Sequence, residues 1–265
     1  MTFKIGWFST GRDKQARLLL QESHEAAKQG KIGDASISYV FSNSEREENK
    51  ESDKFIDLVN RLGIAFVSFS STKFKSGLRK KGLKDIKSGN FELINRWRAL
   101  YDREIVKKVQ EYPAEAIFLA GYMLILGEKI CEKFPILNLH PALPCGPKGT
   151  WQEVIWQLIE KKERESGIMI HRVTCELDAG PAITYCKFSL RGEMFDPLWK
   201  KMQEKLKHKT LTQIKKEEGE KEPLFKAIRE EQKKREIPLV ISTLHLLGEA
   251  KINLQNLKGP LLVEI

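Results

Sequence analysis

AIFLAGYMLILGEKICEKFPILNLHPALP, residues 116–144, contains two short apolar runs, AIFLAG and PILNL. The second run includes Asn138 and leads into His140, which Pro141 follows. Alternate residues of an extended strand share a face, so Asn138 and His140 should point the same way. Pro141 cannot donate to a strand ladder, and the strand should end there. The stretch therefore predicts an amide and an imidazole side by side at the carboxyl end of a central strand, where open α/β sheets build their sites.

Strand-like and helix-like segments alternate along most of the chain. Hydrophobic periodicity and glycine stops place helices at 14–29, 51–62, 91–111 and 151–162, with a short helix in the basic connection 72–90. Strands are expected at 3–9, 35–42, 64–70, 116–121, 136–140, 167–177 and 182–190. This alternation predicts an α/β fold, with a Rossmann-like, mostly parallel sheet and helices on both of its faces.

The composition changes near residue 196. We expect an α/β domain over residues 1–195 and a charged helical extension over 196–265, whose final helix and strands pack back on the domain. Within the extension, 196–222 should be a solvated helix with a loop. Residues 222–248 are expected to form a helix or a pair of helices, with Pro238 marking a start or a kink. A terminal strand pair is expected after residue 250.

Composition limits the classes of function. The 265 residues are 41% apolar and 31% charged, and no apolar run approaches the ~20 residues of a membrane helix, so we expect a cytoplasmic protein with no membrane partner. The four cysteines are scattered without a CxxC pair, which indicates reduced thiols and neither a zinc site nor a disulfide framework.

The net charge of +10 leaves two interpretations open. Helix surfaces rich in Lys and Glu can carry a net positive charge that has no function. Alternatively, the charge can favour binding of a phosphorylated or polycarboxylate small ligand. Nucleic acid is disfavoured as a partner, because the basic residues are interleaved with Glu and are not gathered with aromatic residues. The sequence predicts no oligomeric state.

The first expected strand leads through Thr10, Gly11, Arg12 and Asp13 into a helix. A helix N-terminus offers N–H groups and a positive dipole end to an anion, so Gly11, Arg12 and Lys14 are candidates for a phosphate site. The alternative is an ordinary strand-to-helix turn. The stretch lacks the GxGxxG pattern, which argues against a dinucleotide.

Two motifs carry a resemblance to a known family. The strand ending Asn-Leu-His-Pro is followed by G-x(3)-H-x-V-T-x-E-L-D-x-G-P, formed by Gly167, His171, Val173, Thr174, Glu176, Leu177, Asp178, Gly180 and Pro181. Upstream lie R-x-x-Y-D-R-E from Arg98 and A-G-Y-M-L-I-L from Ala120. With these motifs the chain resembles the glycinamide ribonucleotide (phosphoribosylglycinamide) formyltransferase family of purine biosynthesis, of which it would be a divergent member.

The resemblance implies an enzyme of one-carbon metabolism that transfers a formyl group from 10-formyltetrahydrofolate to the amine of glycinamide ribonucleotide, without a metal. Asn138 would donate a hydrogen bond to the formyl oxygen, His140 would serve the proton transfers, and Asp178 would hold the imidazole. A preorganised donor at a tetrahedral oxyanion can lower the barrier by roughly 3–4 kcal/mol. An imidazole coupled to a carboxylate suits the proton transfers near neutral pH.

The resemblance also implies two binding regions. The substrate phosphate would contact the turn residues Gly11, Arg12 and Lys14 together with Arg98. The folate would lie in an apolar slot with backbone hydrogen bonds. That slot would be lined by Met123, Leu124, Ile125, Leu126, Val173 and Thr174, although the apolar side chains among them could equally belong to the core.

Three departures from the family pattern concern the acceptor. The phosphate loop has lost one glycine and a Ser-Asn pair, the loop after His140 is rebuilt around Trp151, and Lys233 stands where a substrate-contacting Glu is expected. Trp151 could close over the folate or the substrate. A different amine acceptor, such as an amino sugar nucleotide, therefore stays open. A formyltetrahydrofolate hydrolase and a non-enzymatic folate-binding protein are further alternatives.

Overall fold

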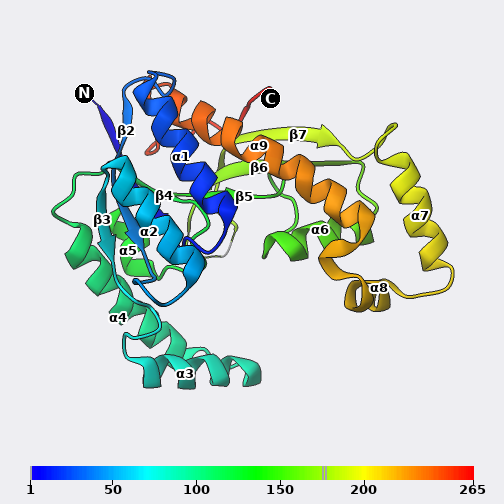
Figure 1. Ribbon diagram of the computed structural model, residues 1–265, viewed down its shortest axis with the longest axis horizontal. Coiled ribbons are helices and arrows are strands. Elements are labelled where there is room, and N and C mark those ends of the chain that lie inside the picture. Colours follow the sequence, from blue (N-terminus) through cyan, green and yellow to red (C-terminus); the bar gives the residue numbers. More distant parts are fainter. Residues whose placement is uncertain (1, 175, 177) are drawn as a thin grey trace.

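Eight strands form one sheet in the order β3-β2-β1-β4-β5-β6-β7-β8, of which β2 to β7 are labelled in Figure 1. The computed structural model describes residues 2–174, 176 and 178–265. Every neighbouring pair is parallel except those of β6, which runs antiparallel to both β5 and β7. The strands are β1 (Phe3–Ser9), β2 (Ala35–Ser42), β3 (Ala65–Ser68), β4 (Ala116–Leu119), β5 (Ile136–His140), β6 (Glu165–Arg172), β7 (Ala182–Ser189) and β8 (Leu261–Leu262).

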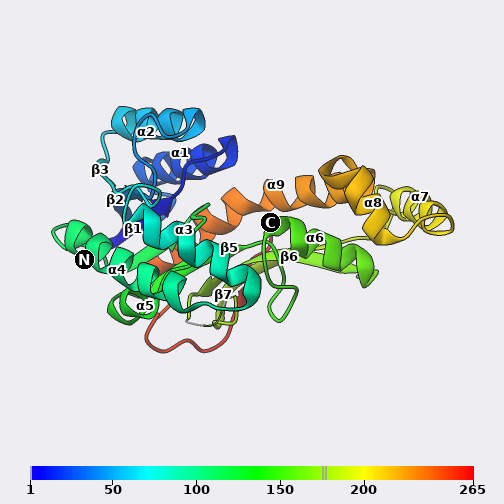
Figure 2. The ribbon, with the colours of Figure 1, turned by 90° about the horizontal axis from the view of Figure 1, so that it is seen from below.

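Helices cover both faces of this sheet, which confirms the expected Rossmann-like architecture (Figure 2). Helices α1, α2 and α9 pack on one face, and α4 and α5 pack on the other. The helices are α1 (Lys14–Lys28), α2 (Lys50–Leu62), α3 (Ser76–Asp85), α4 (Glu92–Val109), α5 (Glu128–Lys133), α6 (Trp151–Glu160), α7 (Asp196–Leu206), α8 (Leu211–Glu217) and α9 (Pro223–Gly248). In the described part of the chain, none of them is apolar over a length that would cross a membrane.

The C-terminal segment contains more helix and less strand than expected. Residues 196–222 form the two helices α7 and α8, and residues 223–248 form the single helix α9 with Pro238 inside it. The expected terminal strand pair is wrong, because β8 is one short strand parallel to β7 and a turn at Asn253–Asn256 precedes it. The expected strand 167–177 ends at Arg172, and its residues Cys175 and Leu177 lie outside the described residues.

Helix α9 joins two hydrophobic clusters. Its first turns, with Leu224, Phe225 and Ile228, pack among α6, α7 and α8, whereas Leu239 and Leu244 pack on the sheet with α1. A helix that is buried on different sides along its length can hold separate layers together. The division at residue 195 stays a prediction, while α9 itself contributes to the core beneath the sheet.

A buried carboxylate anchors the connection between β4 and α5. Asp102 of α4, 2% exposed, accepts a hydrogen bond of 2.6 Å from the Gly127 N–H. Burial raises the pKa of Asp102 to about 6, against the opposing effects of that hydrogen bond and of Arg98. The charged carboxylate at neutral pH therefore carries a desolvation cost.

This cost predicts a pH dependence of stability. The folded-state pKa of Asp102 lies above the unfolded value of 3.8, so the folded state binds more protons between about pH 4 and 6. Stability should fall as the pH rises through that window. Asp102→Asn has no carboxyl group that titrates at this position. Its free energy of unfolding relative to that of the wild type should therefore rise by on the order of 2 kcal/mol from pH 4 to pH 8. Urea unfolding of both proteins at several pH values measures this change. A difference in the free energy of unfolding that does not vary with pH would contradict the raised pKa of Asp102.

A second prediction concerns the turn between β6 and β7. A Cβ placed on Gly180 would lie 1.7 Å from the carbonyl oxygen of Arg172, the last residue of β6. Gly180→Ala should therefore displace backbone and destabilise the fold by about 1–3 kcal/mol or more. Gly77→Ala is the matched control, because nothing lies within 4 Å of its added Cβ. Thermal unfolding of both variants measures the difference, and equal stability would refute the close approach.

Candidate active site

Asn138 and His140 stand at the carboxyl end of β5, in the middle of the sheet. The register pairs Asn138 with His171 on the antiparallel strand β6. Directly opposed residues on neighbouring strands hold their side chains within reach of each other. Three polar side chains are thus brought together by the β5–β6 ladder alone.

His140 is held at both ring nitrogens. Its side chain is almost fully buried, and its Nε2 lies 2.9 Å from the carbonyl oxygen of Pro147. A carbonyl can only accept, so Nε2 carries the proton. The other nitrogen, Nδ1, lies 3.7 Å from Asp178 Oδ2. When His140 is protonated, each of its N–H groups therefore faces an oxygen acceptor.

His171 orients the amide of Asn138. Its Nδ1 lies 3.1 Å from the carbonyl oxygen of Arg172 and must donate to it, which leaves Nε2 to accept from Asn138 Nδ2 at 3.1 Å. Burial lowers the pKa of His171, and the neighbouring His140 lowers it further, so the neutral acceptor form is favoured. The sequence motif contains His171, but no role was predicted for it. The cross-strand register with Asn138 was the signal that could have found it.

Asp178 connects the two histidines. Its side chain is 9% exposed, with Oδ1 3.7 Å from His171 Nε2 and Oδ2 3.7 Å from His140 Nδ1. Oδ2 also accepts a hydrogen bond of 3.1 Å from the Gly149 N–H. Its φ of +49° lies in the left-handed region, which Asp adopts more readily than most residues. One carboxylate thus reaches both imidazoles and the loop that follows β5.

The loop after β5 supplies backbone groups to the site. Pro147 and Gly149 provide the carbonyl and the N–H that contact His140 and Asp178. Trp151, which could close over a ligand, is the first residue of α6. Its ring lies 5.8 Å from the Phe225 ring and 4.8 Å from the Arg229 guanidinium, both of α9. It therefore packs against the first turns of α9.

The expected folate residues divide by exposure. Met123 and Ile125 are 61% and 49% exposed and form apolar surface on the loop after β4. Leu126, in contrast, is buried in the core, and Leu124 packs against the same cluster. Past the end of β6, Val173 and Thr174 follow, and the N–H of Val173 donates to the Ile136 carbonyl.

The turn after β1 touches the same loop. Thr10, which had no expected role, is fully buried and accepts a 2.9 Å hydrogen bond from the Met123 N–H. The expected anion-binding groups are partly used within the protein. Asp13 caps α1 by accepting from the Ala16 N–H at 2.7 Å, and the Gly11 N–H donates to Ser9 Oγ. Arg12 and Lys14 are exposed at this turn.

Arg98 lies on α4, near the connection between β4 and α5. It donates to Asn95 Oδ1 at 3.0 Å, and a Cβ added to Gly127 would lie 3.9 Å from Arg98 Cβ. Burial lowers the pKa of Arg98. Among the described residues its contacts are on the side of the β4–α5 connection, and none joins it to the Gly11–Lys14 turn.

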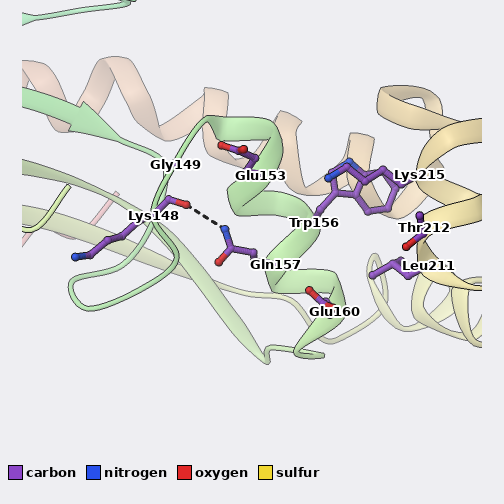
Figure 3. A pocket seen from close by; sticks show the side chains of 9 residues that line it. All are labelled: Lys148, Gly149, Glu153, Trp156, Gln157, Glu160, Leu211, Thr212 and Lys215. Atoms are coloured by element: carbon purple, nitrogen blue, oxygen red, sulfur yellow. Dashed lines mark hydrogen bonds between the residues drawn. The ribbon is translucent and has the colours of Figure 1, made fainter. Parts of the chain in front are cut away.

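A cavity of about 470 Å³ lies behind the loop, between α6 and α8 (Figure 3). Gln157 and Trp156 line it, and Gln157 Nε2 donates to the Lys148 carbonyl at 3.0 Å. None of its lining residues is among the expected site residues. Over the described ranges, no group of three or more His, Cys, Asp or Glu side chains could hold a metal ion.

Comparison with known proteins identifies the family. The chain is 39% identical over 100 residues to a phosphoribosylglycinamide formyltransferase of Dictyostelium discoideum, which covers 34% of this chain and 48% of that protein. It is 36% identical over 92 residues to the protein of the same name from Escherichia coli strain K12, which covers 34% and 42%. The chain thus spans less than half the length of these curated relatives.

In fold the chain is similar to the crystal structure of glycinamide ribonucleotide transformylase 1 from Symbiobacterium toebii, with a TM-score of 0.62 at 17% identity over 95% of this chain and 90% of that chain. The family model described as Formyl transferase matches residues 14–212, about three quarters of the chain. The chain therefore belongs to the formyl transferase family.

Proposed function

We propose that this protein transfers a formyl group from 10-formyltetrahydrofolate to the amine of glycinamide ribonucleotide. The observation that carries the proposal is the Asp178 carboxylate, which lies 3.7 Å from a nitrogen of each histidine while His171 orients Asn138. Membership of the formyl transferase family and the names of its curated relatives support the same reaction.

The proposed chemistry is an acyl transfer. The acceptor amine attacks the formyl carbon, the carbonyl oxygen becomes an oxyanion, and the bond to the folate nitrogen breaks as the carbonyl forms again. The amine loses one proton and the folate nitrogen gains one. The reaction therefore needs a hydrogen-bond donor at the oxyanion and a group that carries a proton.

Asn138 and His140 can meet these needs. An amide nitrogen has two hydrogens, and His171 takes one of those on Asn138 Nδ2, so the other remains for the oxyanion. Protonated His140, with acceptors at Pro147 and Asp178, would place a positive charge beside the developing negative one. Asp178 is then a positioning residue that stabilises this charge.

The donor would lie against the loop after β4. Exposed Met123 and Ile125 offer apolar surface to a flat ring, and the hydrogen bond from Met123 to Thr10 holds the start of this loop against the β1 turn. Val173 and Thr174 would border the same slot. The residues present therefore fit a folate.

The acceptor phosphate would bind near Gly11, Arg12 and Lys14, with Arg98 as a further candidate. Asp13 competes with an anion, because its carboxylate already takes the Ala16 N–H at the start of α1. The Asp13 carboxylate at this helix end favours a second candidate function. In it, the formyl group is transferred to a different amine, whose anionic group would bind elsewhere.

The catalytic assignment predicts the effect of two substitutions. His140→Ala and Asp178→Asn should each lower formyl transfer to glycinamide ribonucleotide by roughly a hundredfold or more, since a proton carrier or its stabilising charge is lost. Folate affinity, measured by calorimetry, should change less than about tenfold. His208→Ala, at an exposed position, is the control. Full activity in either variant would overturn the mechanism. Turnover without any amine would indicate a hydrolase instead.

The phosphate assignment is tested by steady-state kinetics. Arg12→Ala and Lys14→Ala should raise the KM for the acceptor several-fold and leave the KM for the folate unchanged, because each removes a cation from the turn. Arg98→Ala should do the same if it reaches the phosphate. A rise in the folate KM alone would assign Arg98 to the donor side.

A further inference from the structure

The loop between β5 and α6, residues 141–150, is held by a helix outside the site. Two backbone groups of this loop contact side chains of the site: the Pro147 carbonyl contacts His140, and the Gly149 N–H contacts Asp178. Neither contact can form unless the loop keeps its path. The residues that hold its two ends therefore bear on catalysis without touching substrate.

Gln232 of α9 holds the beginning of the loop. Its side chain is fully buried, and Nε2 donates a hydrogen bond of 2.9 Å to the carbonyl oxygen of Pro141. Pro141 directly follows His140, so this bond fixes the chain where it leaves β5. The Oε1 atom of Gln232 has no hydrogen-bond partner among the described residues. Because Oε1 has no partner, the hydrogen bond from Nε2 to Pro141 is the polar interaction that offsets the cost of burying this amide.

Arg229 holds the end of the loop. Its guanidinium lies 4.8 Å from the ring centroid of Trp151, the residue that opens α6. Arg229 also makes an ion pair of 2.6 Å with Glu236, and both side chains are largely buried. A planar guanidinium that stacks on a ring while paired to a carboxylate is fixed in orientation.

The same face of α9 reaches the turn after β1. Arg229, Gln232 and Glu236 are three and four residues apart, the spacing that aligns side chains along one helix face. Glu236 Oε2 accepts a hydrogen bond of 2.7 Å from Gln15 Nε2, in the first turn of α1. This face thus connects both ends of the 141–150 loop with the helix that follows the Gly11–Lys14 turn.

We propose that Gln232 and Arg229 are positioning residues for formyl transfer, which hold the 141–150 loop so that Pro147 and Gly149 orient His140 and Asp178. The kinetic part of this inference rests on the proposed function, whereas its structural part does not. It also assigns a role to α9. This helix contacts the first turn of α1, next to the Gly11–Lys14 turn, and both ends of the 141–150 loop.

The structural part is tested by amide hydrogen exchange of the whole protein, followed by NMR. Gln232→Leu keeps the volume and removes the donor to Pro141. It should speed exchange of the Gly149 amide by about tenfold or more, which corresponds to about 1.4 kcal/mol of lost protection. The amide of Ile170, on β6 between β5 and β7, should be unchanged. Unchanged exchange at Gly149 would overturn the proposal.

Arg229→Lys provides a second variant with an intact charge beside Glu236. It removes the planar group from Trp151 and should also speed Gly149 exchange, though not that of Ile170. Lys234→Gln is the control for both variants, because Lys234 is exposed and pairs only with Glu231 among the described residues. Equal exchange in Arg229→Lys and Lys234→Gln would remove Arg229 from the proposal.

The kinetic part is tested by separating kcat from KM. Gln232→Leu should lower kcat roughly ten- to a hundredfold and leave both KM values within a few-fold, because misplaced catalytic groups slow the chemical step. In Gln232→Glu, the protonated carboxyl can donate to Pro141 and the ionised form cannot, so kcat relative to wild type should rise as the pH falls. An effect of Gln232→Leu on KM alone would contradict a positioning role. So would a ratio of Gln232→Glu kcat to wild-type kcat that does not change with pH. A wild type that formylates no acceptor would refute the proposed function and leave the exchange test standing.

Discussion

The carboxylate of Asp178 is the group on which the rest of the site depends. It lies between His140 and His171, at 3.7 Å from a nitrogen of each, and accepts the Gly149 N–H. A nearly buried carboxylate must be paired or hydrogen-bonded, and here its partners are the Gly149 N–H and, when it is charged, the His140 imidazole. Its position therefore requires the antiparallel strand β6, the left-handed turn that follows it and the path of the loop after β5.

Much of this arrangement was predictable from local patterns. Strand periodicity placed Asn138 and His140 together at the end of β5, and the alternation of strands and helices indicated the doubly covered sheet. The role of His171 was not predicted, because it depends on which strand pairs with β5 and in what register. The same holds for Pro147, whose carbonyl contacts His140 only because the loop turns back.

The turn after β1 and the packing of Trp151 illustrate why motif comparison alone was insufficient. The turn after β1 was expected to present free N–H groups, yet Asp13 and Ser9 accept from Ala16 and Gly11. Trp151 was a candidate to close over a ligand, and its ring packs against a guanidinium and a phenyl ring of α9, more than seventy residues later in the chain. The contacts of Asp13 and Ser9 are local to the turn, whereas the packing of Trp151 depends on a tertiary contact between distant segments, which a motif does not record.

The most direct test of this account is the tautomer and charge of the two site histidines, read from long-range ¹H–¹⁵N NMR spectra of the wild-type protein. The chain has five histidines, so each can be assigned by substitution. At pH 7 we expect His171 to be neutral with its proton on Nδ1, and His140 to carry a proton on Nε2. A charged His171, or one protonated on Nε2, could not accept from Asn138 and would contradict the orientation of this amide by His171.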